Sequence, residues 1–289
     1  MSGDRAAPDA APRVRALVPV DLDFAVAQSD REGWTTSRAW FEALLAHDPD
    51  GCFVAETGGE RIGLATTTRF AATGWIGNLI VLPAHRRGGL GSRLFTQCLE
   101  RLRSTGAATV RLEADPPGVN IYRRFGFVDE LTSLRFRVRA ASSISPGRVV
   151  PLHASALPEI TRCDLPAFGD DRNRFLGLLL DRAEAAFGVP AGDGLAGYAL
   201  TIRTLGGVHV GPLVASDEAV AAELLAACLA AAAGKLVTID VPEPNRAAVG
   251  LMGRLGFEAT APCRRMVWGE QQAGGDAARN FALATGATG

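Results

Sequence analysis

The sequence predicts an α/β protein with a mixed α+β sheet, made of two related domains in tandem. Its 289 residues exceed the length of one small domain, since domains average roughly 150 residues. β-rich runs alternate with amphipathic helical segments in both halves. Residues 76–129 and 207–259 share the same order of strand, helix, strand and Gly-Phe pair, which indicates an internal repeat.

The elements of the first half follow from its hydrophobic patterns. Asp21 is a suitable N-cap for a helix, and Gly58-Gly59 between two β-rich runs predicts a hairpin. In order, we expect a strand at 13–19, helices at 22–28 and 37–47, strands at 52–57, 61–70 and 75–82, a helix at 92–104, a strand at 110–114, a short helix at 119–125 and a strand at 134–140.

Composition marks the ends of the chain and the boundary between the domains. Residues 1–12 are rich in Ala, Pro and Asp, and residues 270–289 are rich in Gly and Ala, so we expect both to be disordered tails. The linker composition of residues 141–150 separates a first domain at 13–140 from a second at 151–269.

The overall composition narrows the class of partner. The formal net charge of -1 provides no broad cationic field, so we expect a small-molecule partner, with no nucleic acid and no membrane. The five cysteines are widely spaced and never form a CxxC pair, which indicates neither a disulfide framework nor a metal site. The first residues lack the apolar core of a signal peptide, so we expect a cytoplasmic protein.

A glycine-containing turn joins the strand that ends near Val81 to the next helix. Residues 86–92 read Arg-Arg-Gly-Gly-Leu-Gly-Ser. Glycines let backbone N–H groups approach an anion closely, and the helix N-terminus adds partial positive charge. Because Arg86 and Arg87 supply full charges, the turn indicates a pyrophosphate site. An ordinary Gly-rich turn is the alternative.

Two motifs in the first half resemble those of a known family. Arg86-x-x-Gly-x-Gly91 resembles the R/Q-x-x-G-x-G/A signature of the GCN5-related N-acetyltransferases (GNAT), and Tyr122-Arg-Arg-Phe-Gly-Phe127 is similar to the Tyr-x-x-x-Gly-Phe ending of that family. Residues 112–122, and Gly-Pro-Leu at 211–213, resemble the two-domain YitH/HolE-like subgroup. The resemblance implies tandem GNAT-like domains and acetyl-CoA as the cofactor.

The resemblance also implies roles for individual residues. In this family the strand before the glycine loop diverges from the next strand, and the acyl-pantetheine arm lies in the gap. Tyr122 would be the general acid that protonates the departing thiolate; the alternative is a core aromatic residue on a short helix. The implied cofactor-binding residues are Leu79, Ile80, Val81, Arg86, Arg87, Gly88, Gly89, Leu90, Gly91 and Ser92.

The general base is less well defined by the sequence. Glu113 alternates with Leu112 and Ala114 on a predicted strand, so it is a candidate catalytic residue that faces an acceptor cleft. A solvated Glu113, Asp115 in its place, and a chain of water molecules are the alternatives.

The second half differs from the first where chemistry would take place. Asp217 and Glu218 stand in place of the glycine loop, and two carboxylates at a helix start cap the helix but repel a pyrophosphate. Met252 stands in the position of Tyr122. We therefore expect a degenerate second domain and one intact acyl-CoA site, in the first domain.

Three residues are candidates for binding the acceptor. Trp34 lies between the first two helices, where the family has its acceptor-facing loop. Phe168 and Arg172 lie where the chain enters the first helices of the second domain, and ligand clefts favour domain interfaces. The alternatives are burial of Trp34 against its own helices and a solvated Arg172.

These observations predict an N-acetyltransferase that moves an acetyl (acyl) group from acetyl-CoA to a primary amine of a small molecule or peptide, by direct attack in a ternary complex. The alternative is a non-catalytic acyl-CoA-binding or sensing protein, which the intact Tyr122 and glycine loop disfavour. A nucleotide-binding domain of another type is weaker still, because GxGxxG and GKS/T are absent. The acceptor and the oligomeric state do not follow from the sequence.

Overall fold

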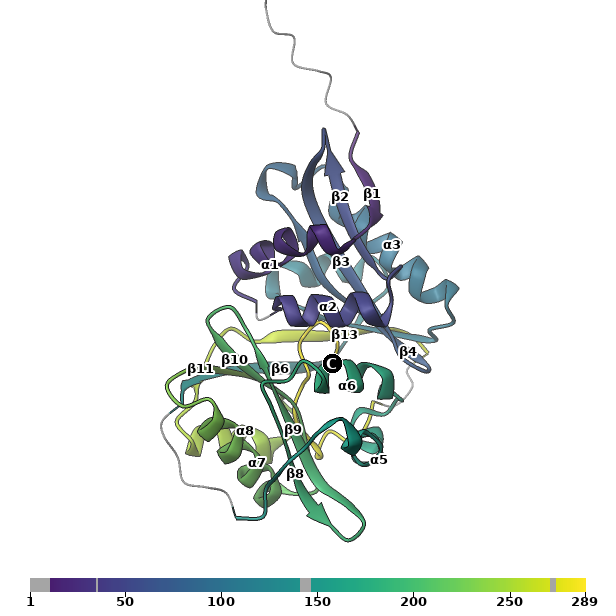
Figure 1. The fold of residues 1–289 in the computed structure, drawn as a ribbon. Coiled ribbons are helices and arrows are strands. Elements are labelled where there is room, and N and C mark those ends of the chain that lie inside the picture. Colours follow the sequence, from purple (N-terminus) through teal and green to yellow (C-terminus); the bar gives the residue numbers. More distant parts are fainter. Residues whose placement is uncertain (1–10, 35, 141–146, 271–273) are drawn as a thin grey trace, which may run out of the picture.

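The computed structural model describes residues 11–34, 36–140, 147–270 and 274–289. Within these ranges all strands belong to one mixed sheet that runs through both halves of the chain (Figure 1), and its β4–β5 and β10–β11 ladders are parallel. The strand order is β1 (Arg13–Ala16), β2 (Cys52–Thr57), β3 (Glu60–Arg69), β4 (Thr73–Val81), β5 (Thr109–Ala114), β13 (Cys263–Gly269), β6 (Val128–Arg139), β11 (Leu236–Pro242), β10 (Gly207–Ala215), β9 (Gly194–Arg203), β8 (Ala185–Ala191) and β7 (Val150–Pro151), with β12 (Glu258–Ala259) beside β6 and β14 (Asn280–Ala282) beside β10.

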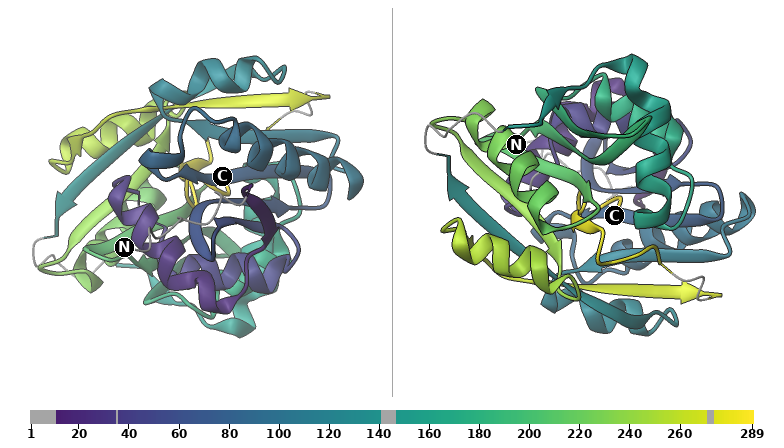
Figure 2. Two further views of the ribbon diagram at one scale, coloured as in Figure 1. Left: turned by 90° about the horizontal axis from the view of Figure 1, so that it is seen from above. Right: turned by 90° about the horizontal axis from the view of Figure 1, so that it is seen from below.

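Helices cover this sheet in both halves (Figure 2). They are α1 (Leu22–Arg31), α2 (Arg38–His47), α3 (Leu90–Ser104), α4 (Val119–Arg123), α5 (Leu157–Phe168), α6 (Asn173–Leu180), α7 (Glu218–Ala231) and α8 (Arg246–Arg254). The strand and helix patterns predicted for the first half are confirmed, with boundaries that differ by a few residues, except that β6 begins at Val128 and not at residue 134. In the described part of the chain, no helix is long and apolar enough to cross a bilayer.

The internal repeat is confirmed in three dimensions. In each half a helix connects two strands that pair in parallel. These are β4, α3 and β5 in the first half and β10, α7 and β11 in the second. Gly126 and Gly256 both adopt positive φ after a short helix, which ends each helix with a left-handed residue. The next residue donates its N–H to the carbonyl of Tyr122 in one half and of Met252 in the other. Met252 is therefore the structural counterpart of Tyr122.

The two halves exchange strands, which the sequence did not indicate. β13, from the second half, lies between β5 and β6, while Ser133–Arg139 of β6, from the first half, pairs with β11. The predicted domains at 13–140 and 151–269 therefore do not correspond to separate sheets. Most of the predicted linker, residues 141–146, lies outside the described residues.

The prediction of a disordered tail at 270–289 is wrong for residues 274–289. β14 pairs antiparallel with β10, and the chain then continues between the two halves, where its end lies in Figures 1 and 2. Phe281, Leu283 and Thr288 are buried. The Gly and Ala content that indicated disorder instead permits close backbone approach: a Cβ at Gly77 would lie 2.5 Å from that of Ala287.

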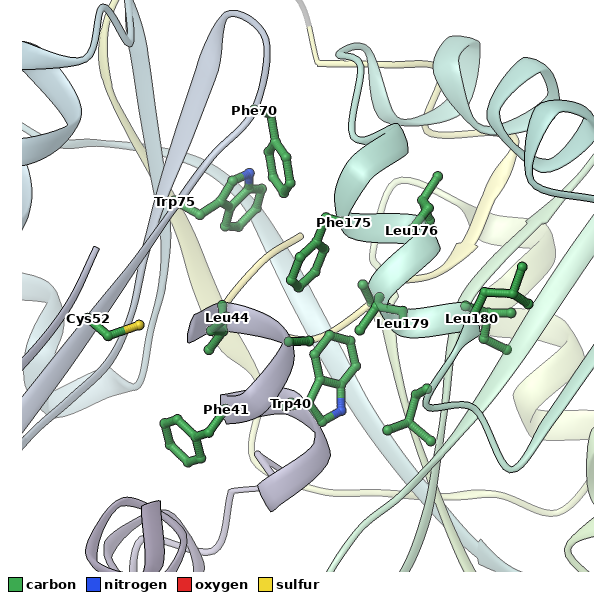
Figure 3. Packing of buried hydrophobic residues seen from close by; sticks show 14 of the residues in the cluster. Trp40, Phe41, Leu44, Cys52, Phe70, Trp75, Phe175, Leu176, Leu179 and Leu180 are labelled. Atoms are coloured by element: carbon green, nitrogen blue, oxygen red, sulfur yellow. The ribbon is translucent and has the colours of Figure 1, made fainter. Parts of the chain in front are cut away.

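A hydrophobic cluster joins the two halves beside α2 and α6 (Figure 3). Trp40 of α2 and Phe175 of α6 are fully buried, with ring centroids 6.1 Å apart. Phe175 also contacts Phe70, which precedes β4. Separate clusters fill the space beneath α3 and beneath α7 and α8. Because a shared core holds them, the halves form one packed unit.

A buried charge pair lies beside this shared core. Arg172 donates two hydrogen bonds of 2.8 Å to the two carboxylate oxygens of Asp164, and each side chain is only 1 % exposed. Arg172 also donates a 2.8 Å hydrogen bond to the carbonyl of Gly289, and the Arg172 guanidinium lies 3.9 Å from the ring centroid of Phe168. Tyr198 donates its hydroxyl to Asp164. Arg172 thus connects α5 and α6 to residues 283–289.

We expect Arg172→Met to destabilise the fold strongly. Removal of one partner leaves Asp164 buried and uncompensated, which costs about 3–5 kcal/mol. The matched control is Arg246→Met, because Arg246 and Glu243 form an exposed pair whose loss costs about 0–1 kcal/mol. Urea denaturation measures both changes. A loss below about 1 kcal/mol for Arg172→Met would show that the pair is not needed for the fold.

Candidate active site

The parallel strands β4 and β5 separate partway along their length. Their ladder covers Thr73 to Trp75 of β4 opposite Thr109 to Arg111, and β4 then continues to Val81 without a recorded pairing to β5 in the described residues. At the divergence Asn78 adopts φ 50°, and its side chain bonds to Thr36 and Thr66 at 2.8 and 3.0 Å. This fixed irregularity opens a gap in the sheet.

The glycine loop lies at the far end of this gap. Arg87 and Gly89 adopt φ of 69° and 81°, so the backbone turns sharply before α3 begins at Leu90. Gly89 is the N-cap and has no side chain, which leaves the first N–H groups of α3 without a side-chain acceptor. A sharp exposed turn before an uncapped helix start suits a phosphate group.

The two loop arginines have different surroundings. Arg86 donates to the carbonyl of Val81 at 2.7 Å and forms a 2.7 Å ion pair with Glu32. Arg87 is exposed and has no recorded polar partner in the described part of the chain. Arg86 is therefore tied to the end of β4, while Arg87 is free to meet an anion.

Tyr122 lies on α4, close to the aromatic residues beneath α3. Its ring centroid is 5.1 Å from that of Phe95, and a Cβ at Gly118 would lie 3.2 Å from its ring. Burial raises the pKa of the Tyr122 phenol well above its usual value, and the nearby Asp115 carboxylate raises it further. The hydroxyl is therefore protonated at neutral pH, as a proton donor must be.

A cleft of about 450 Å³ opens between the halves beside the gap. The residues that line it come from the α1–α2 connection, β4, β5, β6, β11 and the last residues of the chain. Its charged and aromatic lining consists of Glu32, Trp34, Glu113, Asp115, Arg135, Phe136, Arg137 and Asp240, with Thr285, Gly286 and Ala287 on the remaining side.

Glu113 has one carboxylate oxygen with two partners and one with none. Oε1 accepts 2.8 Å hydrogen bonds from Arg265 and Ser133, while the buried Oε2 has no hydrogen-bond partner among the described residues. Burial raises the pKa of this carboxyl above its usual value, against the opposing effect of Arg265. A buried carboxylate with a raised pKa and a vacant oxygen is suited to accept a proton.

Asp115 is more fully engaged than Glu113. One oxygen accepts the indole N–H of Trp34 at 3.0 Å, and the other accepts from Arg135 and from the thiol of Cys263, both at 3.0 Å. Trp34 therefore lines the cleft, where Asp115 orients it, and its role in binding the acceptor stays a prediction. Both Asp115 oxygens have donors, which favours Glu113 as the proton acceptor.

Phe168 and Arg172 lie elsewhere, and their prediction as acceptor-binding residues is wrong for this cleft. Arg172 is fully paired with Asp164, and Phe168 contacts Phe70 at 5.1 Å between ring centroids. Sequence reasoning also missed Arg135 and the lining at Thr285–Ala287. Thr285–Ala287 carry no sequence signal beyond small residues, and they reach the cleft because β14 pairs with β10.

The corresponding gap of the second half is filled. β10 and β11 pair in parallel only from Gly207 to His209, and β14 then lies against β10 where β11 has diverged. Asp217 caps α7 by accepting the N–H of Val220 at 3.0 Å. In the described residues of the second half, β14 thus fills the gap and Asp217 caps the helix that corresponds to α3.

Comparisons with known proteins agree with this geometry. Residues 20–127 match the model of the acetyltransferase (GNAT) family, and residues 160–282 match a model described as an acetyltransferase (GNAT) domain. The chain is 25% identical over 247 residues to holothin acyltransferase of Pseudoalteromonas, covering 84% of this chain and 83% of that protein. It is 28% identical to the uncharacterized N-acetyltransferase YitH of Bacillus subtilis, covering 63% of this chain and 65% of that protein.

A solved structure extends the likeness to the whole chain. The putative acetyltransferase from Pyrococcus horikoshii superimposes with a TM-score of 0.84 and 27% identity, covering 100% of this chain and 99% of that one. Both halves match GNAT models, and the relatives are named as acyltransferases. The chain is therefore an acyltransferase that belongs to the GCN5-related N-acetyltransferase family, in its two-domain form.

Proposed function

We propose that the protein transfers an acetyl (acyl) group from acetyl-CoA to a primary amine of a small molecule or peptide, by direct attack in a ternary complex. One observation carries this proposal: the open gap between β4 and β5 adjoins a cleft lined by Glu113, whose buried Oε2 has no hydrogen-bond partner among the described residues. The gap suits the thioester arm, and the carboxylate suits the proton of an amine.

The proposed cofactor site follows the gap from β4 to α3. Backbone groups of Leu79, Ile80 and Val81 would line the pantetheine arm and the thioester. Gly88, Gly89, Leu90, Gly91 and Ser92 would present backbone N–H groups to the pyrophosphate, with Arg87 as the free cation and Arg86 anchored at the end of β4. Because β14 occupies the second gap, we propose one acyl-CoA site per chain.

In the proposed reaction, Glu113 Oε2 accepts a proton from the acceptor amine as its nitrogen attacks the thioester carbonyl carbon. The tetrahedral intermediate then collapses, the C–S bond breaks, and Tyr122 donates its phenolic proton to the leaving thiolate. Oriented binding in one cleft lowers the barrier by making attack effectively intramolecular. The products are the N-acyl amine and free CoA.

The charged groups of the cleft suit a polar acceptor. Its lining carries four carboxylates (Glu32, Glu113, Asp115 and Asp240) and two guanidinium groups (Arg135 and Arg137). Three of the carboxylates, Glu32, Glu113 and Asp115, form ion pairs with Arg86, Arg265 and Arg135, so the cleft offers polar side chains without a large excess of charge. One of the relatives is named holothin acyltransferase. A cytoplasmic location stays a prediction.

The non-catalytic binding or sensing function that the sequence left open is not favoured by the likeness to acyltransferases, and a measurement of activity tests it. An enzyme releases free thiol from acetyl-CoA when an amine is added, whereas a sensor binds acetyl-CoA without turnover. A panel of amines screened for thiol release therefore decides between them. No acetylation of any amine in a broad panel, with acetyl-CoA bound, would favour the sensor.

The first prediction concerns cofactor binding. The double variant Arg86→Glu/Arg87→Glu should lose CoA affinity by at least tenfold, because reversed charges repel the phosphates. The control is Arg123→Glu/Arg124→Glu, an adjacent exposed pair on and after α4. Calorimetric titration of the wild type should saturate at one CoA per chain. A stoichiometry of two, or unchanged affinity in the loop variant, would contradict the site.

The second prediction concerns the general acid. Tyr122→Phe removes one hydroxyl, so kcat should fall about a hundredfold or more while acetyl-CoA affinity hardly changes. Tyr198→Phe is the matched control, since it removes the other tyrosine hydroxyl, which bonds to Asp164 away from the cleft. That variant should lose stability and keep its kcat. A kcat for Tyr122→Phe within about twofold of wild type would make Tyr122 a packing residue.

The third prediction concerns the base and its pH dependence. Glu113 must be ionised to accept a proton, so activity should fall as pH drops through its pKa. Because burial raises that pKa, the fall should occur above the value of about 4.3 of an exposed glutamate. Glu113→Gln should abolish this acid limb and lower kcat about a hundredfold or more.

Ser133→Ala is the matched control for the base. It removes a hydrogen bond that stabilises the ionised carboxylate and keeps the carboxylate itself, so the acid limb should move to higher pH while kcat at the plateau is retained. An unchanged pH profile in both variants would remove Glu113 from the proton transfer.

A further inference from the structure

The last residues of the chain pass from the second half to the first. We call residues 283–289 the closing segment. Leu283 donates its N–H to the carbonyl of Asp240 at 2.8 Å, directly after β14, and the segment then forms a tight turn. Within that turn the N–H of Ala284 bonds to Gly289, and the N–H of Gly289 bonds to Thr285. The segment is buried except at Gly286.

Both ends of the closing segment are held in place. At its start, β14 fills the gap between β10 and β11, and Gly211 has no room for a side chain because the carbonyl of Leu283 lies against it. At its end, Arg172 holds the carbonyl of Gly289 through a 2.8 Å hydrogen bond. A segment fixed at both ends has little conformational freedom left to lose when a ligand binds beside it.

The middle of the closing segment contacts the first half at the divergence of β4 and β5. Ala287 packs on Gly77, next to Asn78 where the strand is irregular. Gly289 packs against Trp75, the last residue of β4 that pairs with β5. A Cβ at Gly286 would lie 3.4 Å from Cβ and Cγ of Glu113 and 3.8 Å from Arg135. Residue 286 therefore faces the carboxylate that we propose as the base.

We infer that the closing segment is a specificity-determining wall of the acceptor site, and that Gly286 sets the space available to the acceptor next to Glu113. This inference rests on the proposed function. The gap proposed for the cofactor in the first half corresponds to the gap that β14 fills in the second. β14 thereby fixes Thr285, Gly286 and Ala287 along the cleft. The second half thus shapes the acceptor pocket of the first.

The absence of a side chain at residue 286 has a direct consequence for acceptor size. Its φ is not in the positive range, and an added Cβ would meet only ordinary contact distances, so other residues fit the backbone there. A larger side chain would extend toward Glu113 and Arg135 and occupy cleft volume. Binding of amines with bulky groups near the nitrogen would weaken most, and binding of the smallest amines would weaken least.

The experiment compares Gly286→Ala, Gly286→Leu and wild type on a series of primary amines of increasing bulk. The control is Gly253→Leu on α8, where an added Cβ has nothing within 4 Å. We expect Gly286→Leu to lower kcat/KM about tenfold or more for bulky amines and much less for small ones, with Gly286→Ala intermediate. The KM for acetyl-CoA should stay within about twofold.

The outcomes separate this inference from the proposed function. If wild type acetylates no amine, the proposed function fails and this inference fails with it. If wild type is active and Gly286→Leu and Gly286→Ala keep its order of preference among amines, only the inference is overturned. A raised KM for acetyl-CoA with unchanged acceptor preference would place the closing segment beside the cofactor instead, which also overturns it.

Discussion

The strand exchange between β6 and β13 determines how the rest of the molecule is built. Each half gives one strand to the other, so the sheet is continuous and the cleft lies where the two contributions meet. Arg265 reaches Glu113 only because β13 lies beside β5. Arg135 reaches Asp115 from β6, which lies on the other side of β13. The orientation of the candidate catalytic groups thus depends on backbone pairing between the halves.

Two buried ion pairs illustrate different uses of charge in this fold. Asp164 has both oxygens bound by Arg172 and a further donor in Tyr198, which is the arrangement expected of a structural pair. Glu113 has one oxygen bound and one without a partner. A buried acceptor without a donor costs free energy in the folded protein, and such costs are tolerated where the group meets a ligand or a proton.

The local features of the fold could be predicted from the sequence, because turn residues and hydrophobic periods are local signals. The unit of β4, glycine loop and α3 is one case, and Tyr122 before Gly126 is another. The exchange could not be predicted, since β13 has the same alternation of side chains whichever sheet it joins. Arg172 was misassigned because a buried arginine and an exposed one look alike in sequence, and its contact with Gly289 spans 117 residues.

The place of β13 also bears on how the chain folds during synthesis. Arg265 lies 152 residues after Glu113, so a ribosome needs roughly 8–30 s after β5 is made to synthesise β13, which pairs with β5 in the folded protein. During that interval β5 has an open edge able to pair with other strands, and contacts of such long range form slowly. A fragment that stops at residue 140 would lack β13. The halves are repeats in sequence, yet each completes its part of the sheet with a strand from the other.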